Sequence, residues 1–124
     1  LIIAFVAFAV YGIGIFLNVN RLAQIEQFKN ELQTDITKTY DDGGSDHFEY
    51  TLPNKIKQVC FIKDNYENMY FMPLNSDYTG KLLKNVDITK TLGSLSKLCI
   101  PNVDGKIFIT LRKEYNEVLV TIIK

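Results

Sequence analysis

Residues 1–22 read LIIAFVAFAVYGIGIFLNVNRL, and the first charged side chain is Arg21. From Leu1 to Leu17 every residue is apolar apart from Tyr11 and two glycines. A helix of about 17 to 19 such residues is roughly 26–29 Å long, close to the thickness of the hydrocarbon core of a bilayer. The stretch therefore predicts a helix that suits a membrane or another apolar environment.

Three interpretations of this stretch compete. An uncleaved signal peptide normally has a basic start, a shorter apolar core and a small-residue cleavage site, and residues 1–22 show none of these. A signal anchor normally carries Lys or Arg on its cytoplasmic flank, whereas Arg21 lies on the far side. The lack of an initiating methionine favours the third interpretation, a mature chain from which a short basic leader has been cut.

The following residues continue the helix with a different pattern. In NVNRLAQIEQFKNELQTDITKTY, residues 18–40, apolar side chains are three or four positions apart and no Pro or Gly intervenes. This spacing predicts one apolar stripe on an amphipathic helix. We therefore expect a continuous helix from Leu1 to about Thr39, about 60 Å long, that ends at the turn sequence DDGGSD, residues 41–46. The stripe consists of Leu22, Ile25, Phe28, Leu32, Ile36 and Tyr40.

Residues 41–124 have the pattern of a small β domain. Apolar and polar residues alternate or form short β-branched runs, which Pro, Gly and Asn separate. The last twenty residues predict a β-hairpin, and NVDGK before it, residues 102–106, predicts a tight turn. A short helix or irregular turn capped by Asp87 or Thr89 is expected in residues 86–98. The expected strands are residues 47–52, 56–62, 68–74 and the two runs on either side of 113–116.

These segments predict an α+β fold. A long N-terminal α-helix, apolar in its first half and amphipathic in its second, packs on a small antiparallel sheet of four to five strands. Such a sheet buries one face against the amphipathic half of the helix and leaves the other face solvated. We expect residues 1–40 to form the helix and residues 41–124 to form an extracytoplasmic β-rich globular domain.

The two cysteines, Cys60 and Cys99, both lie in segments that predict buried strands. An apolar N-terminal stretch favours export, and two such cysteines commonly pair in an oxidising compartment. A bridge between them would close a loop of about 40 residues and contribute on the order of 4 kcal/mol through the unfolded chain. Two separate buried thiols are the alternative, because spacing alone does not fix disulfide geometry.

Charge and motifs argue against several functional classes. The chain has 14 basic and 14 acidic residues, and the basic ones are scattered, so nucleic-acid binding is not expected. The single histidine, His47, has no recognisable catalytic partner, and we expect no enzyme activity and no catalytic residues. No cofactor or metal motif occurs, and the acidic clusters at 41–49 and 64–68 lack EF-hand spacing and predict solvated turns.

Aromatic residues on loops and strand ends are a further candidate feature. Exposed tyrosines suit adhesion or contacts between subunits, whereas a tyrosine in a strand is more often half-buried in the core. The residues concerned are Tyr66, Tyr70, Phe71, Tyr78 and Tyr115.

An apolar helix that becomes amphipathic, a glycine-rich break and a small antiparallel β domain with one possible disulfide together resemble a type IV pilin-like filament subunit. The resemblance covers the whole chain in architecture and rests on the pattern of segments. Bacterial pilins typically carry a glutamate at the fifth mature position, where this chain has Phe5. The resemblance is therefore to the archaeal kind of pilin-like protein.

The resemblance implies a structural subunit of an extracellular, cell-surface filament without a cofactor. It implies that residues 1–40 lie in membrane lipid before assembly and form the core of a helical homopolymer afterwards, with residues 41–124 outside. A leader peptidase and pilus assembly machinery are further implied partners. The alternatives are a single-pass membrane-anchored extracytoplasmic binding domain and an assembly accessory of a secretion machine. The expected filament-core residues are Leu1, Phe5, Phe8, Tyr11, Gly12, Gly14, Ile15, Leu22, Ile25, Phe28 and Leu32.

Overall fold

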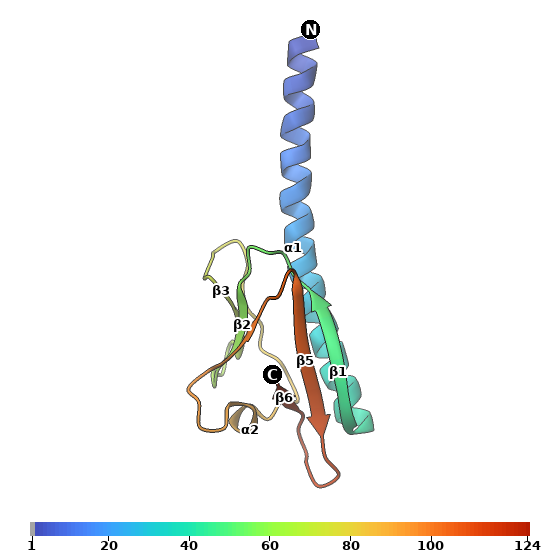
Figure 1. The fold of residues 1–124 in the computed structure, drawn as a ribbon, viewed down its shortest axis with the longest axis vertical. Coiled ribbons are helices and arrows are strands. Elements are labelled where there is room, and N and C mark those ends of the chain that lie inside the picture. Colours follow the sequence, from blue (N-terminus) through green and yellow to red (C-terminus); the bar gives the residue numbers. More distant parts are fainter. Residues whose placement is uncertain (1) are drawn as a thin grey trace.

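A computed structural model describes the backbone of residues 2–124 and the side chains of residues 21–124. Figure 1 shows the strands beside the lower part of the helix α1 (Ile2–Asp42), with β1 (Gly44–Thr51) and β5 (Lys106–Lys113) running alongside it. The elements are α1 (Ile2–Asp42), β1 (Gly44–Thr51), β2 (Gln58–Phe61), β3 (Met69–Met72), α2 (Ile88–Leu92), β4 (Leu98–Pro101), β5 (Lys106–Lys113) and β6 (Thr121–Ile123).

The predicted architecture of one long helix on a single sheet is wrong. The strands form two separate three-stranded antiparallel sheets, in the orders β1-β5-β6 and β3-β2-β4. The packing of the helix on the sheets is established for residues 21–42. The apolar first half of the predicted helix, residues 1–20, lies outside the residues with described side chains. The corrected fold is α+β, with one amphipathic helix and two small sheets.

The Asn102 side chain bridges the two segments of chain that connect the sheets. The Asn102 side chain donates hydrogen bonds to Pro53 O at 3.1 Å and Ile56 O at 2.8 Å, and its Oδ1 accepts one from Gly105 N at 2.8 Å. It thereby joins the two places where the chain crosses between sheets, after β1 and before β5. Asp104 and Gly105 both have positive φ, at 53° and 87°, which confirms the predicted tight turn.

The apolar stripe of α1 forms one side of the core. The side chains of Ile25, Phe28, Leu32 and Ile36 are at most 1% exposed. The stripe is therefore confirmed over this part of the helix. Leu22 and Tyr40, at its two ends, are partly buried against the same core.

Phe28 connects the helix with both sheets. Its ring meets Tyr50 of β1 edge-on, with ring centroids 5.2 Å apart, and Phe71 of β3 at 5.9 Å. The Tyr50 hydroxyl donates a 2.7 Å hydrogen bond to Asp35 Oδ2, about two turns further along α1 than Phe28. Burial, together with the Asp35 carboxylate, raises the pKa of Tyr50, so the phenol keeps its proton and its bond to the helix.

The helix ends where the glycines predicted an end. Gly43 adopts φ 73°, and its amide donates to Thr39 O at 2.8 Å. The Lys113 ammonium donates to Tyr40 O at 2.7 Å and lies 4.8 Å from the centre of the Tyr40 ring. Lys113 therefore places a positive charge at the negative end of the helix and fastens that end to β5.

The connection from β3 to α2, residues 73–87, is held mainly by side chains. The Asn68 amide accepts from Leu83 N at 2.7 Å and donates to Leu83 O at 3.0 Å. Gln33 of α1 pairs with Lys84 in the same way, at 2.8 and 3.2 Å. These two amides supply the backbone partners that a neighbouring strand would otherwise give.

The remaining predicted elements are confirmed with shifted ends. The short helix α2 is capped by Asp87, whose Oδ1 accepts from Lys90 N at 2.9 Å. The connection of the C-terminal hairpin is residues 114–120, longer than the predicted 113–116. It is longer because Val120 N donates to Asn85 O at 2.9 Å, which draws the chain away from β5.

The Cys60–Cys99 disulfide joins β2 to β4, at positions directly opposite in the register of the two strands. The predicted pairing of the two cysteines is confirmed. The bond also closes the part of the chain that contains β3, the 73–87 connection and α2, because these elements lie between β2 and β4 in the sequence.

We predict that a fragment of residues 21–124 folds and that a fragment of residues 41–124 does not. Each of the four buried apolar side chains of the stripe contributes about 1.5–3 kcal/mol, a sum comparable with the whole stability of a small domain. Near-UV circular dichroism and thermal unfolding of both fragments measure this. A cooperative, native-like transition in the shorter fragment would contradict the prediction.

Replacing both cysteines, Cys60→Ser with Cys99→Ser, should lower the free energy of unfolding by about 2–4 kcal/mol. The urea midpoint of the double variant is compared with that of the wild type with and without reductant. We expect the reduced wild type to match the variant. Equal midpoints for the oxidised wild type and the variant would show that the bridge has no stabilising role.

Candidate functional site

The predicted filament-core residues fall into two groups. Leu22, Ile25, Phe28 and Leu32 lie on the stripe, and the last three are fully buried against sheets of their own chain. A contact between α1 and another subunit would therefore use the opposite, polar face of the helix. The second group lies in residues 1–20, whose side chains the structure does not describe, and consists of Leu1, Phe5, Phe8, Tyr11, Gly12, Gly14 and Ile15.

Residues 21–124 offer little that resembles an active site. In this part of the chain no group of three or more His, Cys, Asp or Glu side chains is placed to hold a metal ion. His47 lies on the exposed surface of β1, with Nδ1 2.7 Å from Thr110 Oγ1. Over the same range, no helix has the length and hydrophobicity needed to span a membrane.

The predicted surface aromatics separate clearly by burial. Tyr66 is 88% exposed and Tyr115 is fully exposed, whereas Tyr70 is half-buried. Phe71 and Tyr78 are buried, because Phe71 faces the core from β3 and Tyr78 packs edge-on against it. Tyr115 and Tyr66 mark two exposed apolar surfaces on the domain.

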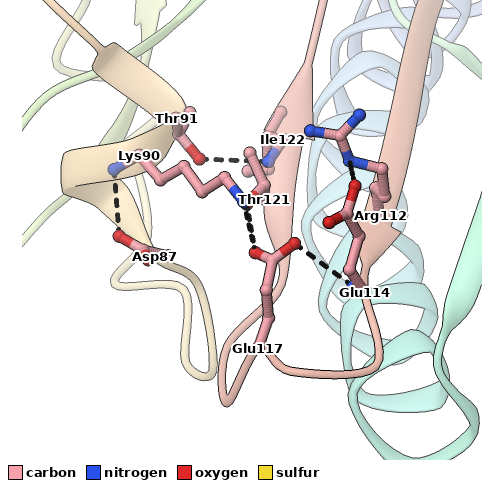
Figure 2. A network of polar contacts seen from close by, with 8 residues as sticks. All are labelled: Asp87, Lys90, Thr91, Arg112, Glu114, Glu117, Thr121 and Ile122. Carbon is pink, nitrogen blue, oxygen red and sulfur yellow. Dashed lines mark hydrogen bonds and ion pairs between the residues drawn. The ribbon is translucent and has the colours of Figure 1, made fainter.

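Tyr115 lies in the tip loop, which we define as residues 114–118 between β5 and β6. Figure 2 shows Glu117 turned back from this loop toward α2. Its carboxylate forms a 2.8 Å ion pair with Lys90 and accepts hydrogen bonds from Glu114 N at 3.3 Å and Thr121 Oγ1 at 3.4 Å. The bond with Lys90 holds the pKa of Glu117 below its usual range.

Two further contacts hold the base of the tip loop (Figure 2). Arg112 Nε lies 3.7 Å from a Glu114 carboxylate oxygen, and Thr91 Oγ1 of α2 accepts a 3.0 Å hydrogen bond from Ile122 N of β6. The loop thus presents Tyr115 and the 75%-exposed Val118 from a fixed base. A rigid base lowers the entropy lost when such residues enter an interface.

The second surface is the β3 groove, lined by Ile62, Tyr66, Tyr70, Met72 and Leu74 with two acidic residues at its rim. Leu74 is 76% exposed. Asp64 at the rim accepts hydrogen bonds from the amides of Tyr66 and Glu67, at 2.7 and 2.9 Å, and these bonds lower its pKa. The groove is apolar and shallow, a form that suits a contact with another macromolecule.

Sequence reasoning found Tyr66 and Tyr115 but not the network that fixes the tip loop. Lys90 and Glu117 come from different elements, and no local spacing indicates that they meet. Nothing in the sequence around Leu74 or Val118 distinguishes these apolar residues from residues of the core. Only the fold shows that both are exposed.

Comparison with known proteins gives this chain no family. No protein-family model, no curated protein and no solved structure matches it. The resemblance to pilin-like subunits therefore stays a prediction.

We predict that Glu117→Gln loosens the tip loop and leaves the rest of the domain folded. Glutamine keeps the shape but not the charge that attracts Lys90, so amides of residues 114–121 should exchange with deuterium faster. In the wild type the ion pair is present above the ordinary glutamate pKa and is lost as the pH falls through the lowered value. The same amides should therefore exchange faster, relative to the rest of the domain, in acid.

Glu31→Gln is the matched control, because Glu31 lies on the exposed side of α1 and belongs to a different set of contacts. Equal exchange of residues 114–121 in the two variants would show that the Lys90–Glu117 pair does not hold the loop.

Proposed function

We propose that this chain is a structural subunit of an extracellular pilus-like filament and that residues 1–20 are its polymerisation element. The observation that carries the proposal is that these twenty residues contain no Asp, Glu, Lys or Arg and directly precede the Arg21–Asp42 part of α1. The part of α1 that follows is fastened to the domain through Ile25, Phe28, Leu32 and Ile36. A force or contact at the apolar segment is therefore transmitted to the whole domain.

The physical logic is an exchange of one apolar environment for another. Before assembly, the segment lies in membrane lipid, and after assembly it lies among the same segments of sibling subunits, so neither state exposes it to water. A contact between different surfaces of identical subunits does not close on itself and propagates as a helical polymer. A leader peptidase and an assembly machinery are the partners that this pathway requires.

Two features of the described domain support the proposal. The Cys60–Cys99 disulfide suits a protein that reaches an oxidising compartment. The exposed apolar residues of the tip loop and the β3 groove suit contacts between neighbouring domains on a filament surface.

A membrane-anchored extracytoplasmic binding domain is the second candidate function. The β3 groove favours it, because an exposed apolar groove also suits a foreign partner. In that case residues 1–20 would hold a single subunit in lipid and would not contact other copies.

Electron microscopy of the full chain, sheared from the surface of the producing cells without detergent, tests the proposal. We expect uniform filaments from the wild type and none from Phe8→Asp, since an unpaired carboxylate in an apolar bundle is strongly destabilising. Ser94→Asp adds the same charge at an exposed turn and should leave filaments intact. Filaments of normal length from Phe8→Asp would contradict the proposal, and particles that appear only with detergent would favour the anchored domain.

A further inference from the structure

A groove runs between α1 and the outer strand β1, and its wall is acidic. Glu26, Glu31 and Asp35 line it from the helix and Glu49 lines it from the strand, while none of the described residues lining it is Lys or Arg. The half-buried ring of Phe48 supplies an apolar floor.

Two of the four carboxylates have no cationic partner in the described part of the chain. Glu31 accepts a hydrogen bond from the neutral Gln27 amide at 2.9 Å, and Asp35 accepts one from the Tyr50 hydroxyl. The other two have partners outside the groove, since Glu26 contacts Lys29 at 2.6 Å and Glu49 contacts Lys106 at 3.6 Å. The wall therefore keeps uncompensated negative charge.

The strand β1 is an open edge along this groove. It pairs with β5 on one side only, in a sheet of order β1-β5-β6. Leu52 N donates to Gly105 O at 2.9 Å, so Leu52 occupies a position that is hydrogen-bonded toward β5. In an antiparallel pair such positions alternate with positions that are not hydrogen-bonded to the partner strand. Alternate residues of β1 therefore turn their N–H and C=O groups away from β5, and no hydrogen bond within residues 21–124 occupies these groups. The residues are Ser45, His47, Glu49 and Thr51.

We propose that this groove binds an extended polypeptide segment of another protein, added antiparallel to β1, with basic side chains at alternate positions. Main-chain bonds to Ser45, His47, Glu49 and Thr51 would supply affinity, as in other cases of strand addition. Successive side chains of the added strand face opposite ways. One set faces α1, where Glu31 and Asp35 attract Lys or Arg, and the other set lies beside His47 and Glu49.

Charge selects this occupant over a second copy of the chain. A second β1 would bring its own α1, which runs alongside it (Figure 1), and would place the carboxylates of the two helices against each other. Like charges in facing positions oppose such a pairing. The inference concerns residues 21–51 only and does not depend on the proposed filament.

The probe is a fluorescent octapeptide of alternating lysine and valine, added to the full-length chain in uncharged detergent micelles. Fluorescence anisotropy measures its dissociation constant. In an antiparallel strand whose lysines face α1, the valine amides bond to β1 and the lysine amides point to solvent. We expect N-methylation of the valines to weaken binding at least about tenfold, and N-methylation of the lysines to leave it nearly unchanged.

Charge-reversing variants of the groove test whether its carboxylates attract the basic side chains of the peptide. Glu31→Lys combined with Glu49→Lys should weaken the lysine–valine peptide at least about tenfold. Asp41→Lys, an exposed position of α1 outside the groove lining, should change binding less than about twofold. Equal binding by the two methylated peptides, an equal loss in both protein variants, or no binding of the parent peptide would overturn the proposal. In that event the charged side chains of β1 would only prevent this edge strand from pairing with other chains.

Discussion

The packing of one apolar stripe of α1 against two small sheets is the interaction on which the rest of the structure depends. Each sheet has only three strands, and neither could bury its inner face without a layer to cover it. Phe28 touches aromatic rings from both sheets, and Ile25, Leu32 and Ile36 extend the same contact along the helix. The helix is thus part of the domain core and not an appendage to it.

In this domain, side-chain amides form hydrogen bonds with backbone groups that have no neighbouring strand to pair with. Asn102 joins the two crossings between sheets, and Asn68 and Gln33 hold the long connection after β3. Asn68 bonds buried backbone groups of Leu83, which need a partner inside the protein, and Asn102 bonds partly buried ones. Gln33 bonds the exposed backbone of Lys84.

Sequence patterns predicted those parts of the fold that depend on residues close together in the chain. The stripe of α1, its end at Gly43, the cap at Asp87 and the tight turn before β5 all follow from spacing and residue type. The division into two sheets was not predicted, because strand pairing depends on contacts between residues far apart in the sequence. The bonds from Asn102 to the carbonyls of Pro53 and Ile56 are contacts of this kind.

The same limit applies to the candidate surfaces. Tyr66 and Tyr115 were two of five candidate surface aromatics, and only the fold separates them from the buried Phe71 and Tyr78. The ion pair between Glu117 of the tip loop and Lys90 of α2 is a contact between distant parts of the sequence, which local patterns do not indicate. The open edge of β1 was also beyond prediction, because an outer strand is recognised only when its neighbours are known.

If the stripe of α1 holds the domain together, the Arg21–Asp42 part of α1 and both sheets unfold as one unit. Native-state hydrogen exchange of the full chain, resolved by residue, measures whether they do. We predict that the amides of Ile25 to Ile36 open with the same free energy as those of Val59 and Ile109, which lie in the cores of the two sheets. Faster exchange of the helix through a separate opening, with both sheets still protected, would contradict the claim.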